Sequence, residues 1–143
     1  MLLTLLAALV AFACYRLLYP DVRGEALAYT ECPFRGEPRV TITDRVIPED
    51  TFPVRRHEEV HAQQCRELGP WRYRVRNLTS SGRLQLEAPA YCAGARARIE
   101  QGLTMVRARE RLIDDATAAF NGLERAPAVR ASLAQSCPEI VRG

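Results

Sequence analysis

Several absences limit what this chain of 143 residues can be. It has no lysine, so all 20 basic residues are arginines, and its net charge is only +3. Nucleic-acid-binding domains usually carry a much stronger basic excess, so no nucleic-acid partner is expected. No two cysteines form a CxxC pair, which argues against a zinc site built from cysteines. Internal repeats and low-complexity segments are also absent from the sequence, and its length fits one domain.

The N-terminal segment differs from the rest of the chain. Residues 2–15 carry no charge and are nearly all apolar, and Arg16 follows them. This run is shorter than the roughly 20 residues of a membrane-spanning helix and suits a signal-peptide core. If Arg16 snorkels, residues 2–19 would instead serve as a short membrane anchor. We therefore predict a signal peptide or anchor over residues 1–20 and one extracytoplasmic domain, membrane-anchored or secreted, over residues 21–143. A buried N-terminal helix is the alternative.

The cysteine count agrees with an extracytoplasmic location. Five cysteines occur, and Cys14 lies in the N-terminal segment, so four remain for the domain. An even number suits two disulfides in an oxidising compartment. Four cysteines allow three pairings, and reduced, buried cysteines are the alternative.

The first half of the domain is predicted to contain a short β segment and a helix. Residues 21–37 are rich in turn-forming residues and are expected to be loop. Apolar and polar residues alternate in residues 39–47, which predicts one or two short strands that end before Pro48. A helix should begin near residue 53 and continue to about residue 68, where Gly69-Pro70 should end it.

The second half is predicted to be helical. Residues 71–76 fit a strand or a helix, and we favour the helix. Further helices are expected over about residues 84–101, with Pro89 near the first turns, over about residues 104–123, and after Pro127. The helix of residues 104–123 should turn an apolar stripe to the core. That stripe consists of Met105, Leu112, Ala116, Phe120 and Leu123. The sequence thus predicts a mainly helical α+β fold.

Both histidines of the chain fall in one HExxH motif, residues 57–61. Residues four apart lie on one face of a helix, so His57 and His61 can both reach one tetrahedral zinc ion. Glu58 is rotated by about 100° from His57, which puts its carboxylate where it can accept a proton from a zinc-bound water. Glu59 should be solvated, and Gln64 continues the histidine stripe as a contact of a ligand. Two ordinary core or surface histidines on an amphipathic helix are the alternative.

A catalytic zinc ion needs a third protein ligand, and no histidine remains. Glu67 has the spacing of an extended HExxH motif, but Gln64 stands where that motif has a helix-breaking glycine. Glu67 should therefore be rotated away from the metal. Glu87 begins a second helical run that can pack against the first, and it is the better candidate. Tyr91 follows one turn later on the same face, where it can contact a ligand, stabilise an oxyanion or pack in the core.

Together these segments resemble the gluzincin class of zinc metallopeptidases, and especially its small members. The resemblance covers roughly residues 38–100 and includes the HExxH motif and the run Leu86-Glu87-Ala88-Pro89-Ala90-Tyr91. In that class two histidines and the later glutamate hold Zn²⁺, and the glutamate after the first histidine is the general base. The resemblance implies these roles for His57, His61, Glu87 and Glu58, in that order. Tyr91 stands where larger members have an aspartate, and the chain has no further histidine.

Two further features are expected beside such a metal helix. In gluzincins, substrate peptides add as an extra strand to the edge before that helix, and residues 40–46 have the composition for this mode; a plain structural strand is the alternative. A disulfide between Cys65 and Cys92 would join the two ligand-bearing helices, and Cys32 and Cys137 would form the other pair.

The sequence therefore predicts a zinc-dependent metallopeptidase that acts on peptide or protein substrates, with Glu58 as general base and Tyr91 as an auxiliary group. The protein would associate with a membrane through its N-terminal segment. The alternatives are an envelope or interaction protein that binds zinc without catalysis, and a helical protein without metal.

Overall fold

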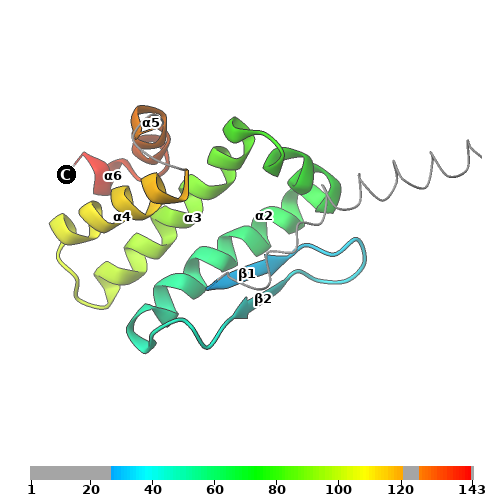
Figure 1. Cartoon of the computed structure of the whole chain (residues 1–143), viewed down its shortest axis with the longest axis horizontal. Helices are drawn as coiled ribbons and strands as arrows, with labels where there is room; N and C mark the ends of the chain where they lie inside the picture. The colour runs from blue at the N-terminus through cyan, green and yellow to red at the C-terminus, as the bar shows by residue number, and fades with distance from the viewer. Residues whose placement is uncertain (1–26, 121–125, 143) are drawn as a thin grey trace, which may run out of the picture.

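The computed structural model describes residues 27–120 and 126–142 (Figure 1). The elements in these residues are, in chain order, β1 (Ala28–Glu31), β2 (Arg39–Ile42), η2 (Pro48–Asp50), α2 (Thr51–Asn77), α3 (Ser80–Glu100), α4 (Met105–Ala119), α5 (Ala126–Ser136) and α6 (Pro138–Val141). Helices dominate and the sheet is small, which confirms the predicted α+β class. The predicted signal peptide or anchor lies outside the described residues. Within those residues, no helix combines the length and hydropathy needed to cross a bilayer.

The long helices α2 and α3 lie side by side and form the centre of the molecule (Figure 1). Small residues on α3 allow the close approach, and Gly94 marks its tightest point. A Cβ added at Gly94 would lie 3.3 Å from the carbonyl oxygen of Pro53 and 3.9 Å from the Cβ of His57. A larger side chain at this position would therefore push α3 away from the histidine-bearing face of α2.

The other side of α3 packs on the C-terminal helices. A buried cluster joins α3, α4, α5 and α6, with Leu112, Leu133 and Ile140 almost fully buried. Removing this apolar area from water is the main force that fixes α3 in place. The predicted apolar stripe of α4 is confirmed at Leu112, Ala116 and Phe120, which are buried. Met105 was wrongly included, because it stands in the first turn of α4 and is 41% exposed, and Leu123 lies outside the described residues.

The sheet differs from the prediction in two respects. Residues 28–31, predicted to be loop, form β1, which pairs antiparallel with β2 from Ala28 opposite Ile42 to Glu31 opposite Arg39. β2 is shorter than the predicted strand of residues 39–47. Residues 28–31 have no regular alternation of apolar and polar side chains. Their strand conformation comes from pairing with β2 and packing against α2.

Helix α2 contains a sharp break where the sequence predicted its end. Gly69 has φ 74° and ψ 158°, a backbone conformation that residues with a Cβ rarely adopt. The helical backbone begins again at Pro70. The preferred helical interpretation of residues 71–76 is therefore confirmed. α3 begins at Ser80, earlier than predicted, because the Thr79 hydroxyl caps it by accepting a hydrogen bond from the Gly82 amide. Pro89 consequently lies inside α3 and not in its first turns.

We expect Gly69→Ala to destabilise the protein by about 1–3 kcal/mol, because the backbone at this position is strained for any residue with a Cβ. Nothing lies within 4 Å of the added methyl group, so the loss would come from backbone conformation and not from a clash. Thermal and urea unfolding measure it, with the exposed Arg66→Ala as a control in the same helix. An unchanged midpoint would contradict the break at Gly69.

Candidate metal centre

Three potential ligand atoms converge between α2 and α3. His57 and His61 stand one turn apart on α2, and Glu87 faces them from α3. The two Nε2 atoms lie 3.1 Å apart, and Oε2 of Glu87 lies 3.4 Å from each of them. The sequence-predicted ligand set is thus brought together, and it is also the group of the described residues that could hold a metal ion.

The size of this triangle is that of a tetrahedral zinc site. Zinc ligands lie about 2.0–2.2 Å from the ion, so two ligands of a tetrahedron are roughly 3.4 Å apart. The three distances between the ligand atoms match that edge length. The chemistry of the donors, two imidazoles and one carboxylate, also fits zinc, and three protein ligands leave the fourth position for water or substrate.

The orientation of His61 is fixed by hydrogen bonds around Gln64. The side-chain nitrogen of Gln64 donates to the carbonyl oxygen of Leu86 at 2.9 Å, so its Oε1 faces Nδ1 of His61 at 3.0 Å. Because an amide oxygen only accepts, Nδ1 must carry the proton. In the neutral ring the lone pair is then on Nε2, the atom that faces His57 and Glu87. Gln64 thus contacts His61, one of the residues predicted to be a ligand.

The electrostatics of the cluster favour a cation at its centre. Burial works to raise the pKa of Glu87, but hydrogen bonds with His57 and His61 outweigh it and hold that pKa far below its usual range. Burial works to lower the pKa of His61, but the hydrogen bond and negative charge of Glu87 outweigh it and raise that pKa. Glu87 is therefore a carboxylate that draws positive charge toward the two imidazoles.

The carboxylate of Glu58 is held in place by a residue of the sheet. Glu58 is only 8% exposed, and the hydroxyl of Thr30 on β1 lies 2.7 Å from its Oε2 and 2.9 Å from its backbone carbonyl oxygen. Thr30 is a site residue that the sequence did not reveal, because it lies in the strand that was predicted to be loop. By contrast, Glu59 is paired with Arg56 near solvent and Glu67 with the side chain of Gln63, so both are remote from the cluster, as predicted.

Two tyrosines flank the candidate metal centre. The Tyr91 ring contacts His57 edge to face at 4.7 Å between centroids, and Tyr73 lies beside His61 at 6.3 Å. Burial, reinforced by the negative charge of Glu87, raises the pKa of both phenols, so both remain protonated at neutral pH. Tyr91 is placed as the sequence predicted. Tyr73 was missed because it comes from the segment after Gly69, whose turn toward the histidines depends on the helix break.

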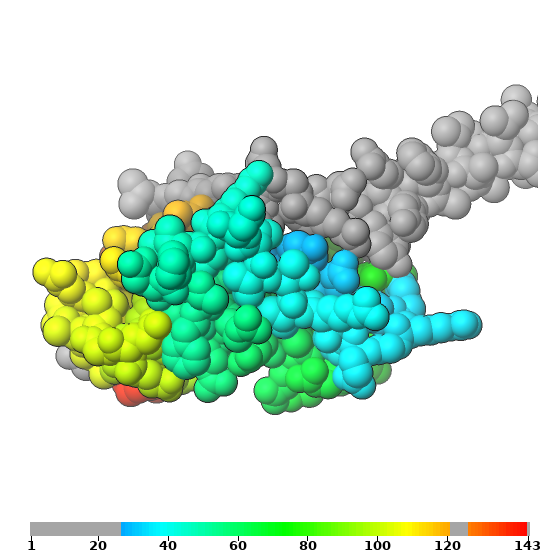
Figure 2. Space-filling view, turned by 90° about the horizontal axis from the view of Figure 1, so that it is seen from below, coloured from blue at the N-terminus to red at the C-terminus, as the bar shows by residue number. Residues whose placement is uncertain are grey.

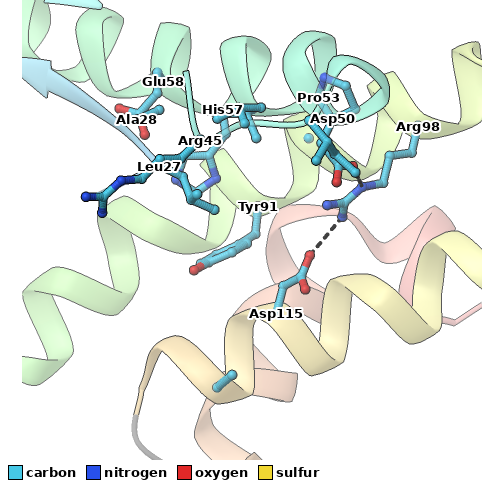
Figure 3. Close-up of a pocket in the computed structure, with 15 residues that line it drawn as sticks. Leu27, Ala28, Arg45, Asp50, Pro53, His57, Glu58, Tyr91, Arg98 and Asp115 are labelled. Carbon is cyan, nitrogen blue, oxygen red and sulfur yellow. Dashed lines mark hydrogen bonds and ion pairs between the residues drawn. The ribbon is translucent and has the colours of Figure 1, made fainter. Parts of the chain in front are cut away.

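A cleft of about 700 Å³ opens beside the centre. Figure 3 shows Tyr91 pointing into it between His57 and Asp115, with Arg98 at its far end. Arg98 donates to Asp115 at 2.9 Å and lies 3.8 Å from Asp50, so its charge is compensated. The other lining residues are largely apolar and come from β1, α2, α3, α4 and the segments just before β1 and η2. They are Leu27, Ala28, Arg45, Val46, Ile47, Pro53, Val54, Glu58, Gly94 and Ala118.

The four domain cysteines form two disulfides, but the predicted pairing is wrong. The bonds join Cys32 to Cys65 and Cys92 to Cys137. Cys65 faces the end of β1 and Cys92 faces the C-terminal helices, because the two cysteines lie on different sides of the α2–α3 contact. One disulfide therefore ties the strand of Thr30 to the metal helix, and the other ties α3 to the segment before α6.

Comparisons with protein-family models, with curated proteins and with solved structures found no match to this chain. The function of the protein is therefore inferred from the geometry of the site.

We expect the double variant Cys32→Ser/Cys65→Ser to lose about 2–4 kcal/mol of stability and to release β1 from Glu58, because the disulfide ends two residues beyond Thr30. Hydrogen exchange of residues 27–31 measures the release. The matched control is Cys92→Ser/Cys137→Ser, which should lose similar stability but keep β1 protected. Equal protection of β1 in both variants would show that the sheet does not depend on this disulfide.

Proposed function

We propose that this protein is a zinc-dependent metallopeptidase that hydrolyses peptide bonds in peptide or protein substrates. The observation that carries the proposal is the tetrahedron-sized triangle of His57, His61 and Glu87, with the buried Glu58 beside it at the wall of an open cleft. His57, His61 and Glu87 would hold the ion. When bound there, zinc would supply a Lewis acid that polarises a carbonyl and brings the pKa of water toward about 7.

Glu58 has the position of a general base. It neighbours His57 in sequence, lines the same cleft, and is held by Thr30, so its carboxylate can meet a water at the centre. In the reaction it takes a proton from the attacking water as the new carbon–oxygen bond forms. It then gives that proton to the amide nitrogen as the carbon–nitrogen bond breaks. Atoms and charge balance without any further reactant.

Tyr91 and Tyr73 are suited to stabilising negative charge on the substrate carbonyl. Both phenols stay protonated at neutral pH because burial raises their pKa, so each can donate a hydrogen bond. Tyr91 lines the cleft, which makes it the better candidate for contact with substrate. Since no further histidine exists in the chain, phenol donors take the part that an auxiliary imidazole would otherwise play.

The cleft also suggests how a peptide would lie. The strand that contacts Glu58 is β1, and Leu27, Ala28 and residues 45–47 all line the cleft. Of the predicted substrate edge at residues 40–46, only Arg45 and Val46 belong to this lining. We therefore expect an extended peptide to lie along the start of β1 and residues 45–47, with apolar side chains favoured by the largely apolar lining.

We expect about one zinc ion per chain in the wild type and loss of zinc in His57→Ala, His61→Ala and Glu87→Gln. Each change removes one of the three converging ligand atoms. Metal analysis after dialysis against a weak chelator measures this, with Glu67→Gln as control because Glu67 is an exposed glutamate of the same helix. A metal-free wild type would refute both zinc-dependent functions, and normal zinc in Glu87→Gln would refute the third ligand.

We expect Glu58→Gln to keep its zinc and to lose peptide hydrolysis by about 10²–10⁴-fold, the usual contribution of a positioned base. The assay uses a mixture of internally quenched peptides, and Glu59→Gln is the matched control, because that neighbouring carboxylate pairs with Arg56 near solvent. Equal turnover in Glu58→Gln would remove Glu58 from the reaction. A wild type that binds zinc but cleaves nothing would favour the non-catalytic alternative.

A further inference from the structure

The helical segment after the break at Gly69 presents an apolar face to solvent. Trp71, Val75 and Leu78 are 57%, 42% and 57% exposed, and their spacing places them on one side of the helix. Large apolar side chains are rarely grouped in this way on a surface without a binding function. We call this set, together with Phe34, the Trp71 face.

The Trp71 face points away from the metal centre. Tyr73, two residues after Trp71, is rotated by about 200° from it, and Tyr73 is the residue that lies beside His61. The segment thus turns its aromatic phenol inward and its apolar stripe outward. Among the described residues, only the inward side packs on the domain, so the outward side is exposed.

Phe34 extends this face from the loop after β1. Phe34 is 55% exposed, and the guanidinium of Arg74 lies 4.3 Å from its ring centroid. Arg74 also donates to the carbonyl oxygen of Cys32 at 2.8 Å, which fixes the loop beside the helical segment. In Figure 2 the green C-terminal part of α2 and the cyan loop region lie next to each other at the lower edge of the molecule.

The helical segment that carries the Trp71 stripe has charged residues of one sign only. Residues 68–86 contain four arginines and no aspartate or glutamate. Arg72 and Arg76 are exposed and lie at one border of the apolar stripe, and Arg74 lies at the other. A second copy of this chain would bring the same positive charge to the contact, so self-association through this face is electrostatically disfavoured.

We propose that the Trp71 face binds the surface of an anionic lipid membrane. An indole and aliphatic side chains bordered by arginines are the groups that bury at the boundary of headgroups and acyl chains, and the arginines match the phosphates there. The segment lies in the interface and does not span the bilayer. Since Tyr73 is on its other side, the bound domain keeps its metal centre facing away from the lipid. This surface does not depend on peptidase activity.

Trp71 is the only tryptophan of the chain, so its fluorescence reports on this face alone. The full chain is mixed with phosphatidylglycerol vesicles and, separately, with phosphatidylcholine vesicles. The anionic vesicles should shift Trp71 emission to shorter wavelengths, and acyl chains brominated near the headgroup should quench it. The shift should weaken in high salt and be several-fold smaller with phosphatidylcholine. Any membrane insertion by the N-terminal apolar segment would occur with both lipids and would not by itself bury Trp71.

Two variants keep Trp71 as the fluorescent probe and change the residues around it. Val75→Ser/Leu78→Ser should reduce quenching by brominated lipid several-fold, and Arg72→Gln/Arg76→Gln should remove the preference for anionic vesicles. Met105→Ser/Val106→Ser is the control, because it removes an exposed apolar pair on α4 and should leave Trp71 quenching unchanged.

Three results would overturn the inference. Trp71 emission that stays unshifted and unquenched while the protein sediments with anionic vesicles would exclude lipid from this face. An emission shift that depends on protein concentration without lipid would identify a second copy as the occupant. Protection of Trp71 from acrylamide in lipid-free, dilute protein would show that another segment of the chain covers the face.

Discussion

The close packing of α2 on α3 is the contact on which the rest of the site depends. One helix carries both histidines and the other carries Glu87, so no ligand set exists unless the two backbones approach closely. Gly94 allows that approach, because a side chain there would meet the carbonyl oxygen of Pro53 one turn before His57. The hydrogen bond from Gln64 to the carbonyl oxygen of Leu86 joins the same helices at the residue before Glu87 and orients His61 as it does so. The contacts that pack α2 on α3 therefore also fix the geometry of the proposed ligands.

The disulfides support this contact from outside it. No disulfide joins α2 to α3 in the described residues; instead each helix is tied by a disulfide to a different neighbour. Cys32–Cys65 holds β1 on α2, which keeps Thr30 on the carboxylate of Glu58. Cys92–Cys137 holds α3 to the C-terminal helices, whose buried apolar cluster fixes its position. The site thus lies between two disulfide-linked parts of the molecule, β1 with α2 and α3 with the C-terminal helices. The cleft opens beside the contact between them.

Features that depend on local periodicity could be predicted from the sequence. The spacing of His57 and His61 follows from the helix repeat alone, and Glu87 with Tyr91 follows from the same rule on the next helix. Apart from the approach of Glu87 to the two histidines, contacts between distant segments could not be predicted. Thr30 reaches Glu58 only because a strand without its own alternation pairs with β2, and Tyr73 reaches His61 only because Gly69 redirects the chain. The cysteine pairing failed for the same reason, since Cys65 and Cys92 share neighbouring helices but face different sides of them.

The central claim is that two imidazoles and one carboxylate form a single zinc site, and X-ray absorption at the zinc edge of the purified protein tests it most directly. We expect a shell of nitrogen and oxygen atoms at about 2.0–2.2 Å, with the outer-shell scattering of two imidazole rings and no sulfur. A sulfur shell at about 2.3 Å, or the signal of fewer than two imidazoles, would contradict the site formed by His57, His61 and Glu87.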